Sequence, residues 1–124
     1  MKLNDFAERY YFHDSYPQKI EFDSIKKTLT ITIHFCNWMQ DYYQSSMEEL
    51  ILVDLIFHDV KLFECNNPEK FDWKYTIFKT ETIVNPLYDN GIEFVLFHDD
   101  SGEMSVIRIF AQDVEFVELG PNND

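Results

Sequence analysis

The chain has 124 residues, which is the size of one domain and enough to bury a core without disulfides or a metal. Aromatic residues make up 17% of it, so a packed interior is expected and a wholly disordered chain is excluded. Twenty-three acidic residues face ten basic ones, a net charge of −13. This charge repels phosphate, which excludes direct binding to nucleic acids and to anionic membrane surfaces.

The first predicted elements are a short helix and a β-hairpin. Asn4 could cap a helix over residues 5–11, with Phe6 and Tyr10 on one face. Residues 19–22 and 28–35 are strand-like, and the second of these runs alternates apolar and polar side chains. The segment 37–49 could form a second short helix or a long ordered loop.

The middle of the chain predicts three further strands. Residues 50–57 are almost entirely apolar, which is typical of a central strand buried on both faces. Residues 60–65 either continue this strand or fold back as another. Residues 71–84 form a long strand in which Phe78 falls out of phase, and such a phase change predicts a bulge or a sharp bend.

The last third of the chain is predicted to contain hairpins. Asp89-Asn90-Gly91 is a strong hairpin-turn signal. Strands are expected at residues 92–97, 104–110 and 114–119, and residues 119–124 are expected to form a frayed tail. The sequence therefore predicts one mainly β domain over residues 1–124: an antiparallel sandwich or partly open barrel of seven to eight strands, with one or two short helices.

The negative charge is concentrated near the C-terminus. Residues 85–124 carry nine acidic side chains against Arg108 alone, a net charge of −8, whereas residues 1–84 have a net charge of −5. Opposite charge accelerates the encounter of two proteins, so a basic protein partner is predicted. The alternative is that the charge serves only solubility.

The cysteines and the start of the chain bear on its location. Cys36 and Cys65 lie far apart and form no CxxC pair, so we expect free, buried thiols and neither a zinc knuckle nor a redox motif. The first residues lack the apolar run of a signal peptide. A cytoplasmic location is therefore predicted.

Three of the four histidines occur in the tripeptide Phe-His-Asp, at residues 12–14, 57–59 and 97–99. Histidine with aspartate can bind a metal or act as a general base, so a three-histidine site is one hypothesis. The other is that each phenylalanine ends an apolar strand and each aspartate opens a turn. Topology would place His13 and His98 at one end of the sheet and His58 elsewhere. We therefore expect no metal and no cofactor, with His13 and His98 as the remaining metal candidates.

The candidate contact residues for a protein partner are aromatic and acidic. Trp38 and Tyr42 follow the strand that ends near residue 35, and both are favoured anchor types in interfaces. Alternatively, Trp38 and one tyrosine close an open end of the core. Asp99 and Asp100 lie in an acidic turn that either rims a binding surface or only forms the turn. We predict partner contacts at Trp38, Tyr42, Asp99 and Asp100.

Common catalytic motifs are missing from the sequence, which favours a non-catalytic function. Besides protein binding, the chain could be a small-ligand-binding barrel with an aromatic-lined interior and His13 and His98 at its mouth. A metal-dependent enzyme is a third possibility. One deep apolar cavity would favour the ligand barrel, whereas a solid interior with an exposed patch would favour protein binding. An unpaired edge strand would also allow a homodimer.

Three segments resemble a group of small, acidic bacterial proteins. The segments are Phe12-His13-Asp14-Ser15 before the first hairpin, the central run at residues 55–60, and Val114-Glu115-Phe116 in the last strand. Several members of this group resemble immunity proteins, which bind and neutralise toxins delivered by neighbouring bacteria. The resemblance implies a protein-binding role and no catalytic residue.

Overall fold

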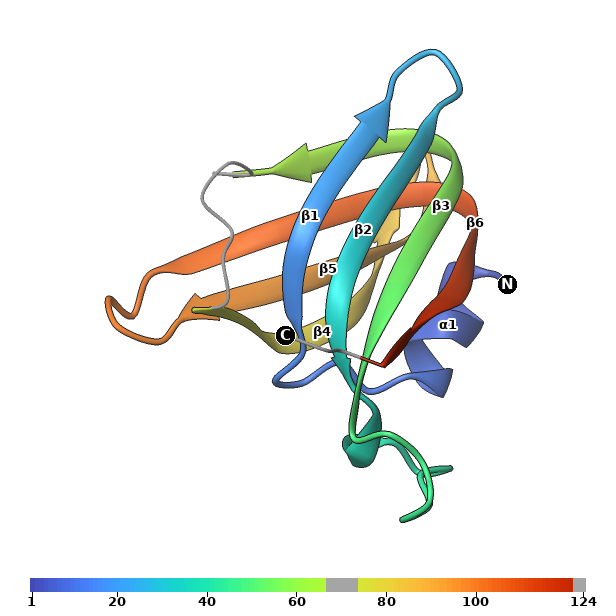
Figure 1. The fold of residues 1–124 in the computed structure, drawn as a ribbon. Helices are drawn as coiled ribbons and strands as arrows, with labels where there is room; N and C mark the ends of the chain where they lie inside the picture. The colour runs from blue at the N-terminus through green and yellow to red at the C-terminus, as the bar shows by residue number, and fades with distance from the viewer. Residues whose placement is uncertain (67–73, 122–124) are drawn as a thin grey trace.

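A computed structural model describes residues 1–66 and 74–121, and these form a mainly β protein built on one antiparallel sheet. Within the described ranges the elements are α1 (Leu3–Arg9), β1 (Tyr16–Asp23), β2 (Thr28–Cys36), the 3₁₀ turn η1 (Asn37–Met39), β3 (Leu50–Cys65), β4 (Tyr75–Asn85), β5 (Asp89–His98) and β6 (Met104–Pro121). The strand order is β1-β2-β3-β6-β5-β4, and every neighbouring pair is antiparallel (Figure 1).

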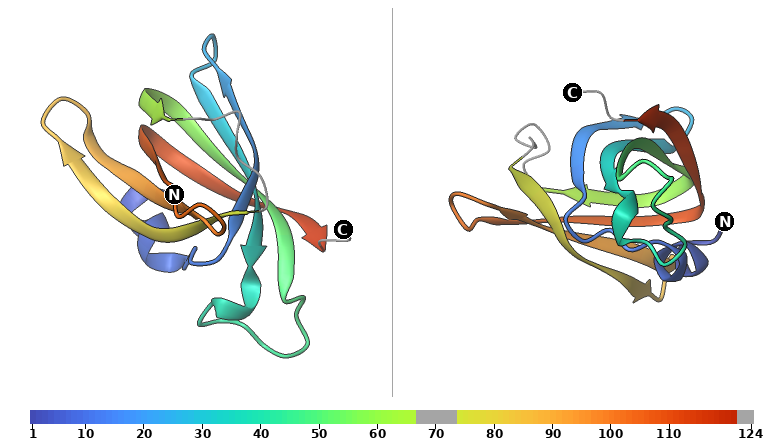
Figure 2. Two further views of the ribbon diagram at one scale, coloured as in Figure 1. Left: turned by 90° about the vertical axis from the view of Figure 1, so that its left-hand side faces the viewer. Right: turned by 60° about the horizontal axis from the view of Figure 1, so that its bottom comes forward.

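The sheet is open but strongly curved. Strands β1, β2 and β3 cross in front of β5 and β4, and the two halves face each other in the turned views (Figures 1 and 2). Near the first strand, the two edges of the sheet are joined by backbone hydrogen bonds. The N–H of Asp14 donates to the carbonyl of Ile77 at 2.9 Å, and the N–H of Ile77 donates to the carbonyl of Ser15 at 2.7 Å.

The prediction of a mainly β, antiparallel fold is confirmed, but the described residues contain six strands instead of seven to eight. Residues 50–57 and 60–65 form the single strand β3, and residues 104–110 and 114–119 form the single strand β6. The pairing of β3 with β6 shifts between Val60 and Leu62, next to Asp59 with its positive φ of 51°. A bulge bends a strand without ending it. Strand β3 therefore continues through residues 60–65, which is one of the two possibilities that the sequence leaves open, whereas β6 continues where the sequence predicts two strands.

Strand β3 is central in the sheet, as predicted, but it is not buried on both faces. Its side chains alternate between buried and half-buried from Leu50 to His58. Asp54 lies on the outer face, where its Oδ1 accepts a hydrogen bond of 2.6 Å from Thr32 Oγ1. No second layer packs on this face in the described part of the chain, so polar groups there keep contact with water.

The helix begins earlier than predicted and Asn4 does not cap it. Helix α1 starts at Leu3, its N-cap residue is Lys2, and no side chain accepts a capping hydrogen bond. Leu3 and Phe6 are both buried in the core. Their packing, and not a capping side chain, therefore fixes where the helix lies.

The hairpin between β4 and β5 turns at residues 86–88, three residues before the predicted Asp89-Asn90-Gly91 turn. Asn85 closes this turn, because its side-chain Oδ1 accepts the N–H of Leu87 at 2.8 Å. Gly91 instead lies in β5 under the ring of Phe110. A Cβ added to Gly91 would lie 2.6 Å from Phe110 Cδ1, so close packing and not a turn requires glycine there.

Two predicted regions reach beyond the described residues. Strand β6 extends to Pro121, which pairs with Ile51, so the first part of the expected tail at 119–124 belongs to the sheet, while 122–124 lie outside the described residues. The predicted strand at 71–84 begins at Tyr75, and residues 71–73 also lie outside. The predicted bulge at Phe78 is confirmed, because the pairing of β4 with β5 shifts between Ile77 and Lys79.

The core lies between the concave face of the sheet and helix α1, which packs against β4, β5 and β6. Aromatic rings form its centre. The ring of Phe12 lies 5.2 Å from that of Phe6, 5.4 Å from that of Phe35 and 5.6 Å from that of Phe94. These contacts join the helix to both halves of the curved sheet.

Candidate functional site

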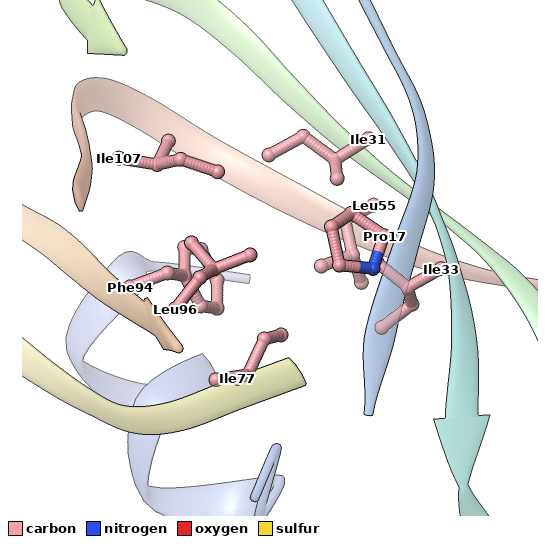
Figure 3. Close-up of a pocket in the computed structure, with 8 residues that line it drawn as sticks. All are labelled: Pro17, Ile31, Ile33, Leu55, Ile77, Phe94, Leu96 and Ile107. Carbon is pink, nitrogen blue, oxygen red and sulfur yellow. The ribbon is translucent and has the colours of Figure 1, made fainter. Parts of the chain in front are cut away.

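Side chains from both halves of the curved sheet point into its interior (Figure 3). An apolar gap remains between the two halves of the sheet, and its volume is about 10 Å³. It is lined by Pro17, Ile31, Ile33, Leu55, Ile77, Phe94, Leu96 and Ile107. Pockets for small ligands usually have about 300 Å³ or more, and about 10–15 Å³ is needed for one water molecule. This gap is therefore too small for a ligand.

The three Phe-His-Asp segments have different surroundings. His58 Nε2 lies 2.5 Å from Glu115 Oε1 on the outer face of β3 and β6. His98 Nδ1 accepts the N–H of Ser101 at 3.1 Å, inside the turn between β5 and β6. His13 Nδ1 lies 3.3 Å from Asp14 Oδ1 in the segment before β1. In the described ranges, no three His, Cys, Asp or Glu side chains come together in a way that could hold a metal ion.

The aspartates of two segments shape the backbone. Asp14 and Asp59 both have positive φ, 68° and 51°, a conformation that aspartate tolerates better than most residues. Phe12 and Phe57 are buried, whereas Phe97 is half-exposed. In these two copies a core phenylalanine precedes a bent backbone, but neither copy ends a strand, since residues 57–59 lie inside β3 and residues 12–14 precede β1. The structural interpretation of the repeat fits only the third copy, in which β5 ends at His98 and Asp99 opens the turn.

The predicted contact residues Trp38 and Tyr42 lie below the sheet, in and after η1 (Figure 1). Trp38 is half-exposed, and its N–H donates to the carbonyl of Glu49 at 3.1 Å. The Tyr42 ring stands edge-on to the ring of Tyr10 at 6.5 Å, and its partial burial raises the pKa of Tyr42 to about 12. Tyr42 thus borders the core while Trp38 faces solvent.

The predicted contact residues Asp99 and Asp100 lie in the turn between β5 and β6. Lys74 Nζ lies 2.6 Å from Asp100 Oδ2, and this hydrogen bond lowers the pKa of the Asp100 carboxyl. The N–H of Asp99 donates to the carbonyl of Lys74 at 3.0 Å. This turn and η1 lie apart in all three ribbon views, so the four predicted residues form two separate clusters (Figures 1 and 2).

A line of exposed rings lies between the two clusters. The rings of Tyr11 and His13 are stacked at 5.8 Å, His13 and Phe78 are 6.2 Å apart, and Phe78 and Phe97 are 6.5 Å apart. Tyr11 is 53% exposed, Phe78 52% and Phe97 38%. We name these four side chains, Tyr11, His13, Phe78 and Phe97, the aromatic ridge.

Hydrogen bonds with the Gln40 side chain hold the Tyr11 end of the aromatic ridge. The N–H of Tyr11 donates to Gln40 Oε1 at 2.9 Å, and Gln40 Nε2 donates to the carbonyl of Tyr11 at 2.6 Å. Gln40 is buried and lies two residues after Trp38, so the ridge begins beside the first cluster. Phe97 precedes His98 and Asp99, so the ridge ends beside the second.

Phe78 lies on the outer face at a β-bulge. Ile77 is buried in the core and its backbone binds Asp14 and Ser15, and the next residue, Phe78, is the extra residue of the bulge. Bulges often re-aim a side chain near a functional site. Sequence reasoning detected the phase change at Phe78 but did not identify Tyr11, Phe78 or Phe97 as candidate contact residues.

The two cysteines are free, as predicted. Cys36 is buried at the end of β2, where it pairs with Leu50 at the start of β3. Cys65 is half-buried at the other end of β3. Burial raises the pKa of both thiols, that of Cys65 to about 11. A raised thiol pKa is the opposite of what a catalytic cysteine needs.

Comparison with known proteins finds no matching family model, no matching curated protein and no matching solved structure. Within residues 1–66 and 74–121, no helix has the length and apolar character that crossing a membrane requires.

Proposed function

We propose that this chain is a non-catalytic protein-binding module of the immunity type, which binds a basic partner protein. The observation that carries the proposal is the contrast between the interior and the outer face. The interior gap of about 10 Å³ is too small for a ligand, whereas aromatic rings stay half-exposed on the outer face. Exposed, contiguous apolar side chains on a soluble protein favour an interaction with another protein.

The charge supports a basic partner. The net charge is −13, and the turn between β5 and β6 contributes Asp99, Asp100 and Glu103. A basic surface would be drawn to this end of the molecule, and the attraction would raise the association rate. The immunity-type assignment itself rests on the resemblance of residues 12–15, 55–60 and 114–116, and a cytoplasmic location is part of the same proposal.

The alternative, a small-ligand-binding barrel, has less support. It needs one deep apolar cavity, and only about 10 Å³ remains between the side chains that point inward from both sheet halves (Figure 3). A homodimer through the edge strands β1 or β4 is a further alternative. The like charge of two copies, each −13, opposes it.

The test is to purify the untagged protein from its own host and to identify, by mass spectrometry and metal analysis, what remains bound. We expect one stoichiometric basic protein. The purified pair is then compared with a variant carrying alanine at the predicted contacts Trp38, Tyr42, Asp99 and Asp100. The proposal predicts at least a tenfold higher Kd for this variant by calorimetry.

A matched control carries alanine at Ile25 and glutamine at Glu21, which are exposed on the β1–β2 hairpin. Its Kd should stay within twofold of that of the unchanged protein. A stoichiometric metal or small molecule without any bound protein would overturn the proposal. Equal Kd values for all three proteins would leave protein binding in place and reject the four contact residues.

A further inference from the structure

We propose that the aromatic ridge is the central contact surface for the basic partner, and that its rings receive arginine or lysine side chains of that protein. This inference rests on the proposed function and deepens it, because it names the surface and the chemistry of recognition. Phe78 and Phe97 would be its main anchors. Neither belongs to the residues that the sequence alone marks as contacts.

The ridge joins the two clusters of predicted contact residues into one continuous surface. The ridge links the η1 region, through the hydrogen bonds of Tyr11 with Gln40, to the acidic turn that follows Phe97. Without it, Trp38 and Asp99 belong to two separate small clusters. With it, they lie at the two ends of one surface. Hot-spot residues usually lie near the centre of an interface and are aromatic, which describes Phe78.

The ridge exposes enough apolar surface to form the centre of an interface. Met104 pairs directly with Phe97 across β5 and β6 and is 53% exposed, so it widens the ridge on the same face. A large side chain of this kind has about 150–250 Å² of surface, and Tyr11, Phe78, Phe97 and Met104 are each about half exposed, so together they offer roughly 400 Å². A standard interface takes about 800 Å² from each partner. The ridge therefore supplies about half, which leaves the rest to the flanking clusters.

Acidic side chains lie beside the ridge. Asp14 follows His13, and Asp99, Asp100 and Glu103 follow Phe97. The two lysines nearest in the chain are already paired with carboxylates. Lys74 Nζ lies 2.6 Å from Asp100 Oδ2, and Lys79 Nζ lies 3.1 Å from Glu81 Oε1.

In the described part of the chain the ridge is thus bordered by surplus negative charge. Aromatic faces attract cations, and a guanidinium on a ring that also reaches a carboxylate gains from both contacts. A second copy of this chain would bring its own acidic residues to the same place, so a basic partner fits better than self-association.

Hydrogen bonds within the chain order the backbone at two positions of the ridge. The backbone of Ile77 is fixed by hydrogen bonds of 2.9 Å and 2.7 Å, and Tyr11 is fixed by its two hydrogen bonds with the Gln40 side chain. A surface that is ordered in advance loses little conformational entropy on binding. This makes exposed rings more effective as anchors than equally exposed rings on loose loops.

The experiment uses a photo-reactive benzoylphenylalanine, placed at position 78, 38 or 22 in the full chain. Phe22 is the matched control, because it is a half-exposed phenylalanine (42%) on β1, at the other end of the molecule. Each purified protein is irradiated in a lysate of its host, and the crosslinked species is identified by mass. We expect the same basic protein at positions 78 and 38 and no crosslink at position 22.

The captured protein is then purified and its Kd is measured. Phe78→Ser and Tyr11→Ser should each raise Kd at least tenfold, whereas Phe22→Ser should change it less than twofold. Circular dichroism checks that each variant is folded, and the tyrosine variant keeps the test valid if the bulge does not tolerate serine.

The outcomes separate the two proposals. A basic protein crosslinked at position 38, with no crosslink at 78 or no change in Kd for the folded ridge variants, overturns the ridge and leaves the proposed function standing. No crosslinked protein at either position overturns both. A second copy of the chain, or an acidic protein, at position 78 overturns the assignment of a basic partner.

Discussion

Alanine in place of the phenylalanine of each Phe-His-Asp segment should have very unequal effects on stability. Phe12 and Phe57 are fully buried, and the Phe12 ring has ring neighbours at 5.2, 5.4 and 5.6 Å. Truncating a buried phenylalanine removes its transfer free energy and leaves a cavity, a loss of about 3–5 kcal/mol. Phe97 is 38% exposed and lies at the end of a strand, so its truncation should cost about 1 kcal/mol.

Urea unfolding followed by circular dichroism measures these losses. A domain of this kind has a free energy of unfolding of about 5–15 kcal/mol and an m-value of about 1–3 kcal/mol per molar urea. Phe12→Ala should therefore lower the midpoint by about 2 M, and Phe97→Ala by about 0.5 M, with unchanged m-values. If Phe97→Ala destabilises the protein as much as Phe12→Ala, Phe97 is part of the core and the argument for the ridge is wrong.

Further predictions concern three other sites in the molecule. Gly91→Ala should destabilise the protein by about 1–3 kcal/mol, because the new Cβ meets the Phe110 ring and the carbonyl oxygen of Ile109. Adding Phe110→Leu relieves the contact with the ring and should restore only part of the loss in the same urea assay. The Cys65 thiol, with a pKa of about 11, should react with iodoacetamide at pH 8 about 100-fold more slowly than an unfolded cysteine, as followed by mass spectrometry. Because the unfolded chain loses this proton near pH 9 and the folded chain keeps it, the Tm should fall as the pH rises above 9; a flat Tm would contradict the burial of Cys65. Glu115→Gln should change the free energy of unfolding by at most about 1 kcal/mol, since its pair with His58 is half-exposed, and a larger loss would show that the pair is structural.

Much of the fold could be predicted from the sequence, because alternation of apolar and polar residues directly reports a strand with one buried face. The hairpin of β1 and β2, the central position of β3 and the bulge at Phe78 all follow from such local patterns. The number of strands did not follow from these local patterns. Asp59 and Asp113 look like the ends of strands, yet β3 and β6 continue past them, because pairing between the two long strands outweighs a local turn preference.

The position of Gly91 shows a second limit of local patterns. Asp89-Asn90-Gly91 has the composition of a tight turn, but the turn formed three residues earlier, where the Asn85 side chain binds the backbone. What the glycine provides is space for the ring of Phe110, which comes from another strand. A contact between residues so far apart in the chain leaves no signal in either segment alone.

The candidate site was harder to predict, for a related reason. Trp38, Asp99 and Asp100 could be identified because their residue types favour interfaces or solvent, and each lies outside a regular strand core. Tyr11 and Phe78 carry no such signal, because an aromatic residue in a strand-rich sequence is usually buried. Only the folded chain, in which Tyr11 is 53% and Phe78 52% exposed, shows that both rings face solvent.

The repeated tripeptide illustrates why counting motifs alone does not locate a site. Its three copies have different places in the fold. The second lies inside β3 and the first precedes β1, and in both the phenylalanine is buried in the core while the aspartate has a positive φ. The third copy ends β5, where Phe97 pairs with Met104 and both side chains stay exposed. What distinguishes the copies is whether the phenylalanine points into the core or to the outer face, and this property belongs to the folded chain. The exposed ring that the ridge needs therefore cannot be recognised from the tripeptide alone.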